Sequence, residues 1–140
     1  MKTVQQIIET HGGLAALREG HISIQSPGYM RLVIEYVGQG PRGLPMVSVA
    51  HYGEQNGDAI RDPEIFFEVF RWNIPGPAGV WGWLPLSIQQ DYLGRYQDIT
   101  WREDGKLLTK PKLEKDVLAF SRTWDRNIKA QGFAEAAAAG

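Results

Sequence analysis

The sequence predicts an α+β domain with an N-terminal helix, a mostly antiparallel sheet of about five strands, and a long C-terminal helix packed on one sheet face. Three observations lead to this fold class. Apolar residues recur at helical spacing near the start of the chain, alternate with polar residues through its middle, and return to helical spacing near its end. No repeat or linker interrupts them, so residues 1–133 are expected to form a single domain. The Ala-rich tail, residues 134–140, is expected to be a frayed helix end, to be disordered, or to derive from a cloning vector.

The first helix is predicted within residues 3–17, and Gly12 with Gly13 is expected to separate it from a short second turn. The alternation that follows predicts strands separated by Gly, Pro and Asn-Gly turns. Pro85 is expected to confine its strand to an edge of the sheet, because proline cannot donate a hydrogen bond to a neighbouring strand. The expected strands are residues 21–25, 29–37, 46–52, 64–72, 83–88 and 92–101.

The clearest element is a C-terminal helix over residues 112–131. Its apolar residues recur at steps of four, three, four and four, and Gly132 suits the position just after a helix end. The stripe is expected to pack on the sheet as part of the core, and it consists of Leu113, Val117, Phe120, Trp124 and Ile128.

Composition excludes several classes of function. Fifteen lysine and arginine residues against sixteen aspartate and glutamate residues give a net charge of −1, without the positive charge typical of nucleic-acid-binding proteins. The absence of cysteine excludes disulfides, thiolate metal sites and cysteine nucleophiles. No apolar run has the length or context of a leader or a membrane span, so the cytoplasm is the expected location. Nucleic-acid binding would instead need a cluster of Arg31, Arg42, Arg61, Arg71 and Arg95.

Signatures of the common enzyme classes are missing. The sequence has no Walker loop, dinucleotide-binding glycine motif, Gly-x-Ser-x-Gly elbow or His-Glu-x-x-His motif. The three histidines, His11, His21 and His51, are expected to be ordinary surface or hydrogen-bonded residues. The sequence therefore favours a non-enzymatic protein, and no cofactor is expected.

Polar residues concentrate between residues 51 and 68. Hard cations such as Mg²⁺, Mn²⁺ and Ca²⁺ bind several oxygen ligands, so this segment is the candidate site of a metal-dependent hydrolase, the alternative function. The favoured interpretation is structural, with a turn at Asn56-Gly57 and with Asp58 and Asp62 bonded to the backbone. Glu68 is expected to be partly buried or to lie on the solvent face of its strand. No metal is therefore expected at the candidate ligands, which are His51, Glu54, Asp58, Asp62, Glu64 and Glu68.

Three tryptophans, Trp72, Trp81 and Trp83, bracket a loop rich in proline and glycine. Exposed aromatic side chains on a rigid loop suit recognition of a protein partner or of a second copy of the chain. The alternative is that the rings fold back and close the core. Both interpretations stay open, and the first makes these three residues the predicted partner-binding site.

Six stretches of the chain are similar to a known family, and they are residues 29–35, 38–45, 48–58, 61–64, 90–94 and 120–127. They resemble a bacterial family that is classed only as a domain of unknown function and that occurs on plasmids, conjugative elements and phage-like regions. The resemblance implies no activity and no catalytic residue, but it implies an accessory role on mobile DNA. The expected function is therefore a non-enzymatic binding or regulatory protein of a mobile genetic element that acts through protein contacts, with counter-defence as one form of that role.

Overall fold

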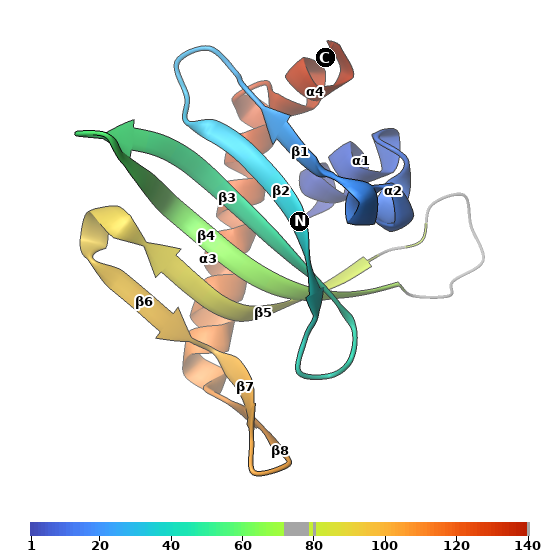
Figure 1. The fold of residues 1–140 in the computed structure, drawn as a ribbon, viewed down its shortest axis with the longest axis vertical. Helices are drawn as coiled ribbons and strands as arrows, with labels where there is room; N and C mark the ends of the chain where they lie inside the picture. The colour runs from blue at the N-terminus through green and yellow to red at the C-terminus, as the bar shows by residue number, and fades with distance from the viewer. Residues whose placement is uncertain (72–78, 80, 140) are drawn as a thin grey trace.

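An antiparallel sheet dominates the residues that the computed structural model describes, which are 1–71, 79 and 81–139. Six strands of this part follow one another in chain order across the sheet, and two more form a separate hairpin (Figure 1). The main strands are β1 (His21–Ile24), β2 (Arg31–Gln39), β3 (Pro45–Gln55), β4 (Asp58–Arg71), β5 (Trp81–Gln90) and β6 (Arg95–Asp98), and the hairpin is β7 (Thr100–Glu103) with β8 (Lys106–Thr109). The helices are α1 (Lys2–Thr10), α2 (Gly13–Glu19), η1 (Asp91–Leu93), α3 (Pro111–Ala130) and α4 (Phe133–Ala139).

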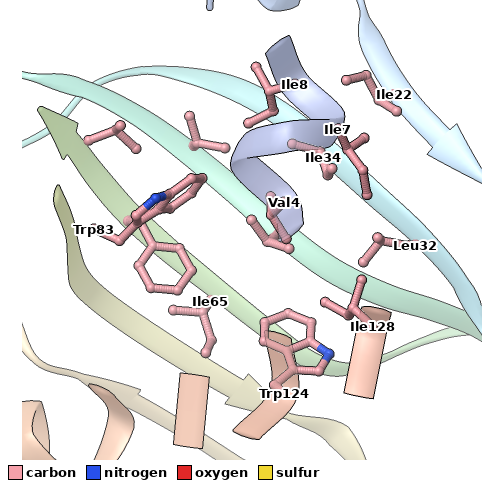
Figure 2. Close-up of a cluster of buried hydrophobic side chains, with 14 of the residues drawn as sticks. Val4, Ile7, Ile8, Ile22, Leu32, Ile34, Ile65, Trp83, Trp124 and Ile128 are labelled. Atoms are coloured by element: carbon pink, nitrogen blue, oxygen red, sulfur yellow. The ribbon is translucent and has the colours of Figure 1, made fainter. Parts of the chain in front are cut away.

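The main sheet has a helical face, on which the core lies, and an open face that no helix of the described residues covers (Figure 1). Alternate strand residues point to the same face, so Leu32 and Ile34 of β2 and Ile65 of β4 are all fully buried on the helical side. Val4 of α1 and Ile128 of α3 complete the same core (Figure 2). The predicted α+β class, with an antiparallel sheet and a long C-terminal helix, is confirmed.

Helix α3 buries most of its predicted stripe. Val117, Trp124 and Ile128 are 4%, 5% and 0% exposed. Phe120 is 37% exposed, and Ser121, at 4%, takes the buried position instead. At about 100° per residue, the buried face is centred near Val117 and Ile128, and Phe120 lies about 80° around the helix from that centre. The prediction that Phe120 belongs to the core is therefore wrong, because packing on the sheet rotates the buried face away from it.

Strand β5 lies between β4 and β6, so the edge position expected from Pro85 is wrong for the strand as a whole, but β6 pairs only with residues 87–90 and Pro85 itself has a paired neighbour on the β4 side alone. The register between β4 and β5 shifts at Phe66 and Phe67, which lie opposite Ser87 and Pro85. The residue without an N–H group therefore lies where the ladder is already irregular, a position in which sheets tolerate proline. The strand expected at residues 92–101 is divided among η1, β6 and β7.

The Ala-rich tail is helical up to residue 139, so the expectation of disorder is wrong for residues 134–139. Helix α4 buries Phe133 and Ala137, which are 0% and 6% exposed, beside α1 and β1. Gly132 separates α4 from α3 with a φ of +81°, which glycine adopts without strain. Alanine has the highest helix propensity, and the buried Phe133 ring anchors the first turn of α4.

Candidate functional site

The open face carries a hydrogen-bonded group of side chains around Glu64, which we call the Glu64 cluster: Ser48, Tyr52, Arg61 and Glu64. Glu64 is only 7% exposed. Ser48 Oγ and Tyr52 OH donate to Glu64 Oε2 at 2.9 and 3.2 Å, and Arg61 Nη1 lies 3.3 Å from Glu64 Oε1. Partial burial and the Glu64 charge raise the pKa of Tyr52, so its hydroxyl stays protonated and keeps donating. The cluster thus fixes four polar side chains on the uncovered face.

The turn between β5 and β6, together with the start of β6, exposes three large side chains, Tyr92, Leu93 and Tyr96, which we call the turn patch. These residues are 63%, 60% and 62% exposed. Asp91 anchors the turn on β4, because its Oδ2 accepts a hydrogen bond of 2.7 Å from the Arg61 backbone N–H. That bond is the main reason why the pKa of Asp91 is lowered. The turn patch is therefore held on an ordered turn rather than on a free loop.

Tyr96 of the turn patch lies on the open face with the Glu64 cluster. Glu64 lies opposite Gln89, and Gln89 lies opposite Tyr96, so the three form one row across β4, β5 and β6. Residues directly opposite one another on neighbouring strands have their side chains on the same face. Tyr96 OH donates to Asp98 Oδ1 at 3.0 Å, and partial burial raises its pKa. This end of the face thus presents aromatic rings beside hydrogen-bonding groups.

Glu68 lies apart from the Glu64 cluster and has a structural role. It is fully buried, so the solvent-face interpretation is wrong. Arg42 Nη1 lies 2.8 Å from its Oε1, and the backbone N–H groups of Arg42 and Leu44 donate to Oε2 at 2.8 and 3.2 Å. A Cβ atom added at Gly40 would lie 2.2 Å from Glu68 Cγ, so only glycine allows this close approach. The carboxylate therefore holds the loop between β2 and β3.

His51 belongs to the core on the helical face. The residue is 9% exposed, and its ring lies 5.6 Å from the Trp124 ring and 5.5 Å from the Phe133 ring. Its Nδ1 lies 3.1 Å from Met30 O, which makes Nδ1 the donor to that carbonyl. Burial lowers the pKa of His51, so the folded protein favours the neutral ring.

The buried His51 predicts that the protein loses stability as the pH falls below the ordinary histidine pKa of about 6.5. Below that pH the unfolded chain binds a proton at His51 more readily than the folded chain, so protonation favours unfolding until the lowered folded pKa is also passed. Urea denaturation at pH 7.5 and 5.5 measures the change. His51→Gln should reduce it, because the glutamine amide can donate to Met30 O without titrating. If His51→Gln loses as much stability as wild type between pH 7.5 and pH 5.5, a group other than His51 causes the loss. The raised pKa of Asp62, which burial causes, acts in the opposite direction at lower pH.

The candidate metal ligands do not converge. His51 faces the core, Glu68 lies under the β2–β3 loop, and Glu64 belongs to the Glu64 cluster. Glu54 and Asp58 are exposed at the turn between β3 and β4. In the described part of the chain, no three His, Asp or Glu side chains are placed to hold a metal ion. The alternative of a metal-dependent hydrolase therefore has no common cleft to support it.

The predicted tryptophan site differs from the expectation of an exposed surface. Trp81 and Trp83 are only 6% and 8% exposed. They occupy alternate positions of β5 on the helical face, stack on each other at 6.0 Å, and Trp83 meets the Phe67 ring edge-on at 5.3 Å. The prediction of exposure is therefore wrong for these two rings, which close the core. Trp72 lies outside the described residues.

The arginines proposed for nucleic-acid binding are engaged in separate contacts. Arg42 pairs with Glu68, and Arg61 pairs with Glu64. The guanidinium of Arg71 lies 5.4 Å from the centre of a Trp81 ring, and Arg31 donates to Ser23 Oγ at 3.0 Å. These four arginines therefore contact four different partners and are not assembled into one basic groove.

Comparison with known proteins identifies the family. The family model described as "Domain of unknown function (DUF6908)" matches residues 2–134, and the chain belongs to this family. No curated protein and no solved structure matches the chain. Among the helices that the structure describes, none is both long and apolar enough to cross a membrane.

Proposed function

We propose that this member of the DUF6908 family is a non-enzymatic binding protein that acts through protein contacts, and that its partner docks on the turn patch. The supporting observation is that Tyr92 and Leu93, on a turn that Asp91 anchors, and Tyr96, on the adjoining strand β6, are each at least 60% exposed. Large side chains held in place give a partner much contact area at a small cost in conformational entropy. The neighbouring Glu64 cluster adds ordered hydrogen-bonding groups at the rim of this surface.

The charges at this end of the sheet favour a basic partner. The β3–β4 and β5–β6 turns lie at the same end (Figure 1). Four carboxylates there take part in no ion pair with a described residue, and the cations free of ion pairs are Arg31 and Arg95. We therefore expect a protein segment that carries Lys or Arg beside apolar side chains, with an association rate that falls as salt is added. The four carboxylates are Glu54, Asp58, Asp62 and Asp91.

The setting that we propose is the cytoplasm of a bacterial cell, where the protein serves a mobile genetic element as a regulatory or counter-defence factor. The resemblance in sequence and the missing enzyme signatures support this setting. The partner is then a protein of the host cell or of the element itself.

The Tyr92→Ser/Tyr96→Ser variant should lose at least about tenfold in affinity for the partner, as expected for aromatic hot spots. Its melting temperature should stay within a few degrees of wild type, because both rings are exposed. The partner is captured from a host lysate on the immobilised full chain, purified, and titrated by calorimetry against each variant. Leu107→Ser is the matched control, because it removes a large side chain that is 42% exposed on β8, outside the turn patch.

Two results would contradict the proposal: equal affinity of wild type and the double variant, or an equal loss in the Leu107→Ser control. Analytical ultracentrifugation of the purified chain tests whether a second copy of the chain binds to the turn patch. A dimer that the double variant dissociates would support the same docking surface, whereas a dimer that persists would place self-association elsewhere.

A further inference from the structure

A pocket of about 400 Å³ lies on the helical side, between the start of α1, the middle of α3 and the start of β5. Its volume is in the range of small-molecule sites. Trp81 and Trp83 form part of its wall, and we call it the indole pocket. It adjoins the beginning of β5, whereas the turn patch follows the end of that strand, so the two sites are separate.

Three cationic side chains line the indole pocket: Lys2, Arg122 and Arg126. All three residues are exposed, and none of them forms an ion pair with a residue that the structure describes. Arg126 donates to Thr123 Oγ1 at 3.3 Å, a weak contact within its own helix. The guanidinium of Arg122 and the ammonium of Lys2 are available to an incoming anion.

The acidic residue among the pocket's lining residues, Asp125, is already engaged. Its Oδ1 and Oδ2 accept hydrogen bonds of 3.1 and 3.0 Å from the Thr3 backbone N–H, and Oδ1 also accepts one of 3.3 Å from Val4. These N–H groups belong to the first turn of α1, where backbone donors lack partners within the helix. Asp125 therefore acts as a cap for α1. An anion bound in the pocket would be attracted by three cationic side chains and repelled by the Asp125 carboxylate alone among the lining residues.

Edges of the two indole rings form an apolar part of the wall beside these cations, because Trp81 and Trp83 are only 6% and 8% exposed and the Arg71 guanidinium lies 5.4 Å from the centre of a Trp81 ring. Trp81 and Trp83 stack with centroids 6.0 Å apart and an interplanar angle of 27°. Trp83 Nε1–H is buried and has no acceptor within the described part of the chain. A buried donor without a partner is costly, and an acceptor atom of a ligand would remove that cost if it reached the ring.

We propose that the indole pocket binds a small anion that carries a flat ring, such as a nucleoside monophosphate or an aromatic carboxylate. The cationic side chains Arg122, Arg126 and Lys2 hold the anionic group, and the ligand ring packs against the accessible edges of Trp81 and Trp83. The anionic group supplies most of the selectivity, because an Arg pair recognises carboxylate and phosphate oxygens in fork geometry. The proposal is independent of the turn patch, and neither site needs the other.

Calorimetric titration of the full chain tests the proposal with four probes: adenosine monophosphate, indole-3-acetate, adenosine and inorganic phosphate. At least one of the two ring-bearing anions should bind at least about tenfold more tightly than adenosine and phosphate do. Binding of the nucleotide alone would identify a phosphate monoester as the ligand class, and binding of indole-3-acetate alone would identify a carboxylate. The Trp83 indole N–H resonance, followed by ¹H–¹⁵N correlation spectra, should shift during the titration.

The Arg122→Gln/Arg126→Gln variant should weaken binding at least about tenfold. The Lys115→Gln/Lys129→Gln variant is the matched control, because it makes the same change of charge on α3 at residues that do not line the pocket. Unchanged resonances outside the pocket show that both variants are folded. The proposal is overturned if neither ring-bearing anion binds, if binding leaves the Trp83 indole resonance in place, or if both variants weaken it equally.

Discussion

Replacing Trp124 with alanine should lower the free energy of unfolding by about 3–5 kcal/mol, the range for large aromatic side chains removed from a core. Trp124 of α3 is 5% exposed in the core (Figure 2), and it packs edge-on against the His51 ring at 5.6 Å. Domains of this size are stable by about 5–15 kcal/mol, so the loss is a large part of the total. Urea denaturation followed by far-ultraviolet circular dichroism measures it without relying on tryptophan fluorescence.

Phe120→Ala is the control for this prediction, because it removes an aromatic ring from the same helix. Phe120 is 37% exposed, and its ring centre lies 6.3 Å from that of Trp124. Its replacement should cost about 1 kcal/mol, in proportion to the apolar area it buries. The assignment of the buried face of α3 would be wrong if both variants lost the same free energy of unfolding, or if Trp124→Ala were as stable as wild type.

The helices could be predicted because their periodicity is local, whereas the exact buried face could not. The spacing of Val117, Trp124 and Ile128 indicates a buried stripe whatever the helix packs against. The choice between Phe120 and Ser121 depends on how α3 is rotated against the sheet, which only the tertiary contacts decide. The edge position expected from Pro85 holds only locally for a similar reason, since the length over which β6 pairs with β5, residues 87–90, is decided by tertiary pairing.

The candidate binding surfaces depend on strand register, which the sequence does not reveal locally. Glu64 and Tyr96 lie on one row only because β4, β5 and β6 pair as they do. The one local signal for the turn patch was the run Asp91-Tyr92-Leu93-Gly94, in which large apolar residues lie next to turn formers. Of the predicted tryptophan group, Trp81 and Trp83 lie side by side, but alternation along β5 directs both rings toward the core. Their burial follows from the order of the strands.

Replacing Arg42 with alanine should destabilise the fold by about 2–3 kcal/mol, because it leaves the Glu68 carboxylate buried without a counter-charge. Removing one partner of a fully buried ion pair costs about 3–5 kcal/mol. We expect a smaller loss here, since the Arg42 side chain is 24% exposed and two backbone N–H groups still donate to Glu68 Oε2. Urea denaturation at neutral pH measures this loss.

Two further variants show whether the loss comes from the isolated charge. Arg42→Ala/Glu68→Gln should be more stable than Arg42→Ala, because the glutamine amide oxygen can accept the same backbone N–H groups and no buried charge remains. Arg61→Ala breaks the pair with Glu64, in which the arginine side chain is 41% exposed, and should cost about 1 kcal/mol or less. If Arg42→Ala costs no more than Arg61→Ala, or if the double variant gains nothing, water reaches the Glu68 carboxylate. The loop between β2 and β3 is then held by its backbone hydrogen bonds, such as the 2.8 Å bond from Gly40 N–H to Leu44 O, rather than by the ion pair.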